Sequence, residues 1–152
     1  VISKSEKNRI LGYDARGSKK QKYNSYGIGE DKTGKGFVSL DGIAIYKFAL
    51  NEVPQFLKDF LHKYGLKNSD IDVIVPHQPN PRMLKDAVAR MGFPEESVLI
   101  SSDQLGNMIG ASVPVTYHRA RKEGRINSGD KVLFLSFGDS YLTANALLFE
   151  EL

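Results

Sequence analysis

Residues 43–64 carry the most regular pattern of apolar positions in the chain. Apolar side chains recur there every three or four residues, which is the period of an α-helix with one broad apolar face. Pro54 lies inside this run, and because proline lacks an amide hydrogen and crowds the preceding turn, we expect it to kink or divide the helix. Gly65 follows the run and suits a helix C-terminus. The apolar positions are Tyr46, Ala49, Leu50, Val53, Phe56, Leu57, Phe60, Leu61 and Tyr64.

A different pattern follows at residues 71–77, IDVIVPH, where β-branched residues occupy most positions. Such runs are typical of strands buried on both faces, as in the central strands of layered α/β proteins. Helical and extended patterns then alternate to the end of the chain. In order, we expect a helix at about 81–91, an extended segment at 97–101, a helix at about 107–122, and two strands at 130–138 and 141–150 joined by a turn around Gly138, Asp139 and Ser140.

Residues 12–36 show no hydrophobic period and are rich in Gly, Ser, Lys and Asn. We therefore expect a loop here. Just before it, the apolar positions between Ile10 and Tyr13 fit a short, half-buried edge strand. We accordingly divide the chain into residues 1–36, an edge strand with a basic Gly/Lys-rich loop, and residues 37–152, the main domain.

The alternation of helices and strands predicts a layered α/β domain with a mixed sheet, whose last two strands pair as an antiparallel hairpin. In sheets of this kind, ligand sites lie beyond the carboxyl ends of strands. His77 stands at one such end, and the turn at 138–140 stands at another. We expect a functional site at this edge of the sheet.

Composition limits the classes of function. A chain of 152 residues has the size of one domain, and no apolar stretch approaches the roughly 20 residues that span a bilayer. The N-terminus lacks the apolar core of a secretion signal, so we expect a cytoplasmic protein without a membrane partner. The chain contains no cysteine, which excludes disulfides, zinc-thiolate sites and thiol catalysis by this chain alone.

Positive charge gathers at the start of the chain, where residues 1–36 carry a net charge of +5 against −2 for residues 37–152. Solvated loops often hold as much, so we expect no nucleic-acid partner. The segment GEDKTGKG, residues 29–36, has the Gly and Lys spacing of a phosphate-binding loop. However, Gly36 stands where such a loop needs a hydroxyl for Mg²⁺, and no buried strand precedes it. A flexible basic loop is the better interpretation.

His77 is the first candidate for chemistry. A single histidine beside apolar residues is more often structural than catalytic, but its neighbours favour a functional role. Gln78 and Asn80 add amide donors beside it. Pro79 and Pro81 keep the local backbone extended, which holds His77 at the edge of the sheet instead of letting it enter the next helix.

Asn107 is the second candidate, in the segment LGNMIGAS at residues 105–112. One interpretation is an ordinary helix start, since asparagine is a good N-cap and the small residues after it allow close packing. In the other interpretation its carboxamide lies beside the His77 imidazole, and both groups donate hydrogen bonds to one oxygen on which negative charge develops. Neither motif decides between these interpretations alone.

Three ordered segments carry a family resemblance: LDGIAIYKFAL at 40–50, DVIVPHQPNPRML at 72–84, and LGNMIGASVPVTYHRARKEGRINSGDKVLFLSFG at 105–138. Together they resemble the C-terminal half of the thiolase-like condensing enzymes, and most closely β-ketoacyl-acyl carrier protein synthase III. The resemblance covers roughly residues 37–150. It implies a five-layered α-β-α-β-α fold of which this chain supplies the second half. It also implies a cysteine nucleophile in the first half.

The resemblance gives His77 and Asn107 the places of two members of a Cys-His-Asn triad. In such enzymes the cysteine takes an acyl group from coenzyme A. The histidine and asparagine bind the thioester carbonyl of malonyl-acyl carrier protein as it loses CO₂, and they stabilise the enolate that attacks the acyl-enzyme. A histidine in this role is neutral, and burial would favour that form by lowering its pKa.

Further roles follow from the same resemblance. Arg82 matches an arginine associated with docking the acidic carrier protein, and Lys85 lies one turn further along the same helix; the plain alternative is a solvated helix surface. Phe137 matches a phenylalanine near the reacting thioester, and Gly138 directly follows it; the plain alternative for Phe137 is core packing.

Two departures from the family pattern bear on function. Pro79 stands where the family commonly has alanine, and residues 138–141 replace a glycine-rich turn. A specialised relative that serves another biosynthetic pathway, or a non-catalytic homologue that partners an active subunit, therefore stays open. For the enzyme, the implied partners are acyl carrier protein, acyl-CoA, the N-terminal half and a second copy in a homodimer. No cofactor or metal is implied.

Overall fold

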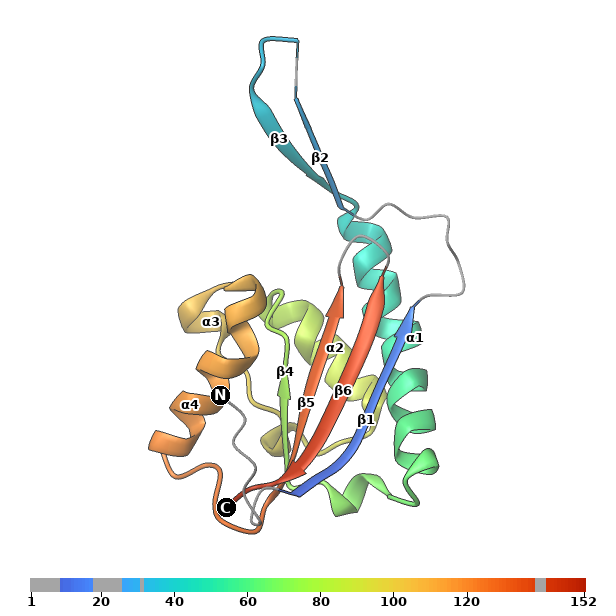
Figure 1. Ribbon diagram of the computed structural model, residues 1–152, viewed down its shortest axis with the longest axis vertical. Coiled ribbons are helices and arrows are strands. Elements are labelled where there is room, and N and C mark those ends of the chain that lie inside the picture. Colours follow the sequence, from blue (N-terminus) through green and yellow to red (C-terminus); the bar gives the residue numbers. More distant parts are fainter. Residues whose placement is uncertain (1–8, 18–25, 31, 139–141) are drawn as a thin grey trace.

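A four-stranded mixed sheet forms the centre of the structure, a computed structural model that describes residues 9–17, 26–30, 32–138 and 142–152 (Figure 1). The strand order is β1, β6, β5, β4. β4 and β5 run parallel, whereas β6 is antiparallel to both of its neighbours, β5 and β1. The predicted α/β class and the terminal hairpin are confirmed. The strands are β1 (Arg9–Gly17), β4 (Val73–Pro76), β5 (Lys131–Gly138) and β6 (Thr143–Glu150).

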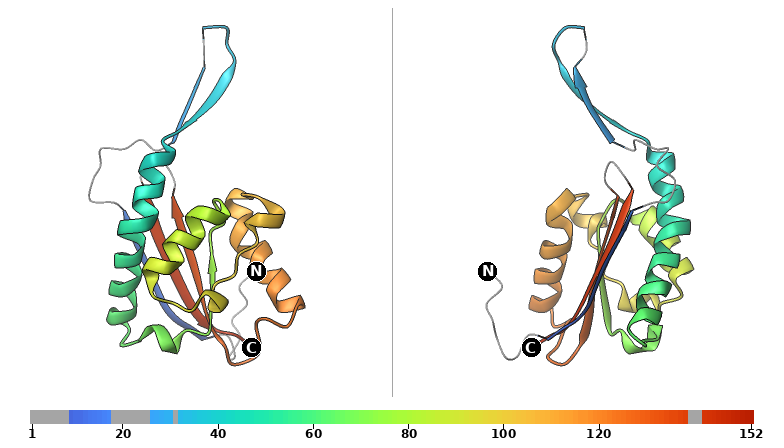
Figure 2. Two further views of the ribbon diagram at one scale, coloured as in Figure 1. Left: turned by 180° about the vertical axis from the view of Figure 1, so that it is seen from behind. Right: turned by 45° about the vertical axis from the view of Figure 1, so that its right-hand side comes forward.

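Helices cover the two faces of this sheet. α1 (Gly42–Lys63) and α2 (Pro81–Met91) lie on one face, and α4 (Ser112–Lys122) lies on the other (Figure 2). The short α3 (Ser102–Leu105) sits near the carboxyl end of β4 (Figure 1). The described residues also form three single turns of 3₁₀-helix: η1 (Asn68–Asp70), η2 (Glu95–Ser97) and η3 (Ile109–Ala111).

α1 confirms the helix expected from the apolar pattern. The Asp41 carboxylate caps its start by accepting a hydrogen bond from the Ala44 amide at 2.9 Å. Gly65, with φ of 66°, ends it: the Leu66 amide donates to the Leu61 carbonyl and the Gly65 amide to the His62 carbonyl. The expectation that Pro54 divides the helix is wrong. The apolar face before and after the proline packs into one continuous core, which outweighs the lost backbone hydrogen bond.

β4 is buried on both faces, as its β-branched sequence predicts. Ile74 belongs to a core between the sheet and the helices α1 and α2, in which Phe56, Leu57 and Phe60 are almost fully buried. Val73 and Val75 point to the opposite face and join a smaller core under α4. The strand therefore contributes to both layers, and β5 does the same.

The expected loop at 12–36 is wrong for most of its described residues. β1 continues to Gly17, and a hairpin of β2 (Tyr26–Glu30) and β3 (Gly36–Leu40) projects from the body near the start of α1 (Figure 1). Residues 18–25 and 31 lie outside the described residues. The candidate phosphate loop at 29–36 falls on the turn of this hairpin. The edge strand predicted before the loop is confirmed, and the boundary at residue 36 stays a prediction.

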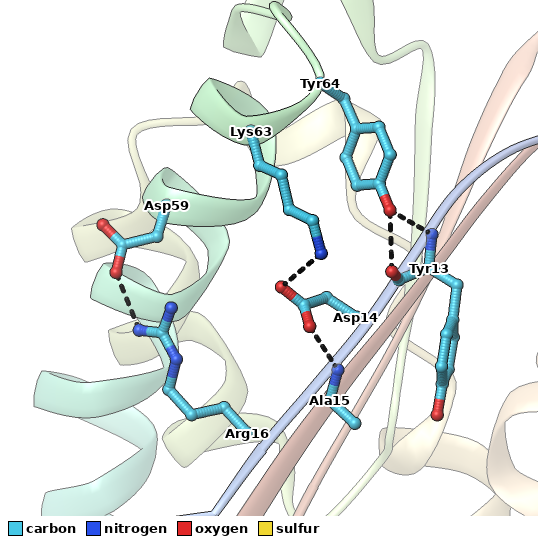
Figure 3. A network of polar contacts seen from close by, with 7 residues as sticks. All are labelled: Tyr13, Asp14, Ala15, Arg16, Asp59, Lys63 and Tyr64. Atoms are coloured by element: carbon cyan, nitrogen blue, oxygen red, sulfur yellow. Dashed lines mark hydrogen bonds and ion pairs between the residues drawn. The ribbon is translucent and has the colours of Figure 1, made fainter.

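Polar contacts attach the edge strand β1 to α1 (Figure 3). Arg16 pairs with Asp59 at 2.7 Å, and Lys63 pairs with Asp14 at 3.3 Å. The Tyr64 hydroxyl donates to the Tyr13 carbonyl at 2.8 Å and accepts from the Tyr13 amide at 3.1 Å. The hydrogen bond from Arg16 is the main reason that the pKa of Asp59 is lowered. None of these contacts appears in a hydrophobic pattern, so the length of β1 was missed.

Two other expectations need correction. The helix expected at 107–122 begins at Ser112, because a loop and the 3₁₀ turn η3 occupy the preceding residues. Pro114 lies in the first turn of this helix, where an amide has no intrahelical partner to lose. The segment 97–101 contributes one isolated parallel bridge, Ile74 to Val98, in place of a strand.

α4 is fixed to the end of β6 by a phenol and a carboxylate. The Tyr117 hydroxyl donates to the nearly buried Glu151 at 2.6 Å, and Arg121 pairs with the other carboxylate oxygen at 2.9 Å. The Tyr117 ring packs edge-on against Phe134 and Phe149. Burial, followed by the bond to Glu151, raises the pKa of Tyr117 to about 12.

We predict that this phenol makes the fold sensitive to alkali. The folded-state pKa lies above the usual value of about 10, so its stabilising contribution is complete below pH 10 and is lost as pH rises toward 12. Tyr117→Phe has no phenol to ionise, so its thermal midpoint should fall less steeply over this pH range than that of the wild type. Thermal unfolding from pH 9 to pH 12 measures the difference. Parallel curves for the two proteins would contradict the assignment.

Candidate functional site

His77 lies at the carboxyl end of β4, directly after the last residue of the strand. Its amide donates to the Leu135 carbonyl at 2.7 Å, so the pairing with β5 extends one residue beyond β4. The half-buried imidazole meets the buried Phe137 ring edge-on, with 5.9 Å between the ring centroids and an interplanar angle of 81°. The structure thus brings together two of the site residues predicted from sequence.

Burial lowers the pKa of His77, and a hydrogen bond to the backbone of Ile109 partly opposes that effect. With a pKa below the usual value of about 6.5, the imidazole is neutral at physiological pH. A neutral ring keeps one N–H and one bare nitrogen.

Asn107 lies on the exposed loop between α3 and η3. It does not cap α4, so the N-cap interpretation is wrong: α4 begins five residues later, with Ala111 at its N-cap. The Asn107 side-chain oxygen instead accepts a hydrogen bond from the Ile109 amide at 2.8 Å. This bond occupies the carboxamide oxygen and leaves the NH₂ group as the donating end.

Ile109 connects the two candidates. Its backbone lies beside the His77 imidazole and partly offsets the lowering of the pKa of that ring, and its amide donates to the Asn107 side chain. The imidazole and the carboxamide therefore contact one residue at one edge of the sheet. Ile109 has φ of +52°, which is rare for a β-branched residue, and 77% of its surface is exposed.

The amides next to His77 have other tasks than the sequence suggested. Gln78 is fully buried and makes four hydrogen bonds to backbone groups, so it offers no free donor beside the imidazole. The Asn80 side chain caps α2 by accepting from the Met83 amide at 2.8 Å, and Pro81 occupies the first turn. The sequence carried a signal for this cap, because asparagine followed by proline is typical of a helix start. The backbone at Asn80 is extended, as predicted.

The remaining predicted residues lie around this edge. Arg82 and Lys85 are exposed on α2. Asp86, one turn after Arg82, accepts a hydrogen bond from the Tyr46 hydroxyl of α1 at 2.5 Å, and this bond is the main reason that the Tyr46 pKa is raised. Gly138 ends β5 with φ of 121°. The substituted turn continues into residues 139–141, which lie outside the described residues.

Metal binding and membrane insertion are two further roles to consider for the described residues. No group of three or more His, Asp or Glu side chains there is arranged to hold a metal ion. Among the helices of the described parts of the chain, none is long and apolar enough to cross a membrane.

A family model described as 3-oxoacyl-[acyl-carrier-protein (ACP)] synthase III C terminal matches residues 61–150. This segment contains both candidates and the sheet edge between them. The chain belongs to this family. Its recognition from the motifs around His77 and Asn107 is confirmed.

Sequence identity to individual proteins supports the same family assignment. The chain is 34% identical over 125 residues to the β-ketoacyl-[acyl-carrier-protein] synthase III of Nitratidesulfovibrio vulgaris, covering 82% of this chain and 38% of that protein. With the enzyme of the same name from Symbiobacterium thermophilum, identity is 39% over 105 residues, covering 69% of this chain and 32% of that protein. The chain therefore spans less than half the length of these relatives.

Solved structures of synthase III match the fold. The 3-oxoacyl-[acyl-carrier-protein] synthase III of Aquifex aeolicus superposes with a TM-score of 0.82 at 27% identity, covering 97% of this chain and 46% of that one. The Thermus thermophilus enzyme gives a TM-score of 0.68 at 30% identity, covering 88% and 47%. The thiolase-like α/β fold class expected from the sequence is confirmed.

Proposed function

We propose that this chain is the C-terminal part of a 3-oxoacyl-[acyl carrier protein] synthase III, an acyltransferase that condenses an acyl-CoA starter with malonyl-acyl carrier protein in cytoplasmic fatty acid synthesis. One observation carries the proposal: the His77 imidazole, held against Phe137 at the carboxyl edge of the sheet, and the Asn107 carboxamide, thirty residues away in sequence, both lie beside the backbone of Ile109. Family membership supports it, and so do the names of the relatives.

In the proposed reaction, a cysteine of the N-terminal half first takes the acyl group from coenzyme A. Malonyl-acyl carrier protein then loses its carboxylate as CO₂, and the electron pair of the broken bond moves into the thioester as an enolate. The His77 N–H and the Asn107 NH₂ donate hydrogen bonds to the enolate oxygen. The enolate carbon attacks the acyl thioester, and the cysteine leaves as a thiolate. Neutral His77 fits this role, since no proton transfer is needed to make it a donor.

Phe137 and Gly138 complete the proposed substrate environment. The Phe137 ring lies against the imidazole, where it excludes water from one side of the donor and so strengthens the hydrogen bond to an anionic oxygen. Gly138 ends β5 next to it and leaves room where a side chain would project. No cofactor or metal takes part in these steps.

The N-terminal half is part of the proposal because this chain has no cysteine. One face of the sheet is also only partly covered. Tyr13 points away from α1 and is 59% exposed, and α4 covers the sheet beside β4 but not beside β1 (Figures 2 and 3). A helix layer from the other half would bury this face. Assembly into a homodimer is the expected state of the complete enzyme.

The test combines this chain with a synthase III N-terminal half, as one polypeptide or as two. Acyl transfer is read from coenzyme A release, and condensation is read from the formation of 3-oxoacyl-carrier protein across acyl-CoA starters of different length. We expect both activities. An assembled enzyme that takes up the acyl group but never condenses it would refute the proposed role. That outcome would instead support the non-catalytic homologue, which Pro79 and the altered turn after Gly138 favour.

We predict that Arg82 contributes to carrier-protein docking through its exposed charge on α2. Arg82→Glu places a repelling charge on this surface, so KM for malonyl-acyl carrier protein should rise about tenfold, with an effect that shrinks at high salt. Lys85→Glu should act in the same direction. KM for acyl-CoA should stay constant, and Lys58→Glu, on the exposed face of α1 remote from the site, is the control. Equal effects at Arg82 and Lys58 would contradict specific docking.

A further inference from the structure

Gln78 is a buried residue whose side-chain carboxamide makes all the hydrogen bonds that it can. The residue has no exposed surface, although glutamine is seldom found fully buried. Its nitrogen donates to the Pro76 carbonyl at 3.0 Å and to the Leu99 carbonyl at 2.8 Å. Its oxygen accepts from the amides of Ser101 at 2.9 Å and Ser102 at 3.1 Å. Both donor hydrogens and both acceptor positions of the carboxamide are thus in use.

These bonds join the two parts of the chain that carry the proposed enolate donors. Pro76 ends β4 and precedes His77, while Ser101 and Ser102 begin α3. The α3 backbone is tied to the same start, because the Leu105 amide donates to the Ser101 carbonyl at 2.9 Å. Asn107 follows two residues later. A displacement of Ser101 and Ser102 relative to β4 would therefore move the loop that carries Asn107.

We propose that Gln78 is a positioning residue, which sets the place of the Asn107 loop relative to the His77 imidazole by clamping the start of α3 to the end of β4. This inference rests on the proposed function and deepens it. The clamp complements the contact through Ile109, which joins the same two segments on the exposed side. Two connections on different sides of the backbone fix both the position and the orientation of the Asn107 loop relative to β4. A single connection would let the loop rotate about it.

Glutamine suits this task better than its neighbours in size. A glutamate of the same length accepts the two amide bonds, but ionised it donates none, and the carbonyls of Pro76 and Leu99 would face its oxygen. A methionine fills the space with no hydrogen bonds and leaves four backbone groups unsatisfied. An apolar residue could fill the same buried space. What distinguishes Gln78 is that its four hydrogen bonds fix the relative position of the backbone segments that they join.

The experiment uses Gln78→Met and Gln78→Glu in the assembled two-half enzyme, with Tyr117→Phe as a control that removes a side-chain hydrogen bond at another part of the fold. Misplacing one donor by about an ångström lowers catalysis on the order of 100-fold. We expect Gln78→Met to lower kcat for condensation by about 10- to 100-fold, with little change in KM for acyl-CoA. The kcat of Gln78→Glu should lie between the values for Gln78→Met and the wild type. Tyr117→Phe should leave kcat unchanged.

A second readout is independent of activity. In the 152-residue chain, NMR resonances of the His77 ring and the Asn107 side-chain NH₂ report the surroundings of these two groups. We expect Gln78→Met, or Gln78→Glu should the first variant not fold, to shift both sets, and Tyr117→Phe to shift neither. Unshifted resonances would overturn the positioning role even if condensation never occurred. An inactive wild-type assembly with shifted resonances would reject the enzyme assignment but keep the clamp.

Discussion

His77→Ala is expected to lower the rate of condensation in the assembled enzyme by about 100- to 1,000-fold, the usual cost of one donor to a developing oxyanion. The imidazole is half-buried against Phe137, so its direction is fixed before substrate arrives. A fixed donor needs no reorganisation when charge develops, which is why its loss should affect kcat more than KM. Acyl uptake from coenzyme A should survive better than condensation.

The pH dependence gives an independent check on His77. Burial lowers its pKa below the usual value of about 6.5, so the neutral form persists at pH 6.5 and is lost only at lower pH. Its contribution to folding has the matching sign: stability is greatest above pH 6.5 and falls as pH drops toward the lowered pKa, because the unfolded chain takes up the proton first. His62→Ala, at an exposed position near the end of α1, is the matched control. Equal losses of condensation activity in His77→Ala and His62→Ala would argue against a catalytic role for the His77 imidazole.

Phe60→Ala is expected to have the largest effect on stability. The Phe60 ring is fully buried in the core between α1 and the sheet, and it packs against Phe56 and Tyr64 with ring-centroid distances of 6.5 Å and 5.0 Å. Truncating a buried phenylalanine costs about 3–5 kcal/mol through lost burial and the cavity that remains. Domains of this size have roughly 5–15 kcal/mol in total, so the variant should lose a large fraction of its free energy of unfolding.

Urea unfolding followed by circular dichroism measures this loss. Lys58→Ala on the exposed side of the same helix is the control, and surface changes of this kind stay within about 0.5 kcal/mol. A shift in the midpoint without a change in slope identifies a stability effect. A loss below about 1 kcal/mol for Phe60→Ala would mean that the helix does not pack as described.

The fold was predictable where local pattern and burial coincide. The three- and four-residue apolar spacing of α1, the β-branched run of β4 and the terminal hairpin each have a strong local signal, and each was found. β1 was read as shorter than it is, because what holds its second half is pairing with β6 and polar contacts with α1, more than forty residues away. The β2–β3 hairpin was missed because its sequence looks like a polar loop.

The sequence indicated candidate residues for the site but not all of their surroundings. His77 and Phe137 meet at the sheet edge, as strand positions suggested. The role of Asn107 stays a prediction, and its N-cap alternative failed because the helix starts later. Gln78 was misjudged: a glutamine beside a histidine looks like a second donor, and only the backbone partners on both sides reveal that it is used up. Partners that are distant in sequence leave no trace in local spacing.

The pairing of Arg9 with Glu150 has a consequence for how two halves of such an enzyme can be connected. Both residues lie at the end of the sheet opposite His77. In the proposed enzyme, a covalent junction that enters the sheet at Arg9 would therefore lie far from His77. We expect a nick or an inserted spacer at that junction to be tolerated, because the proposed halves would associate through their surfaces and not through continuity of the main chain.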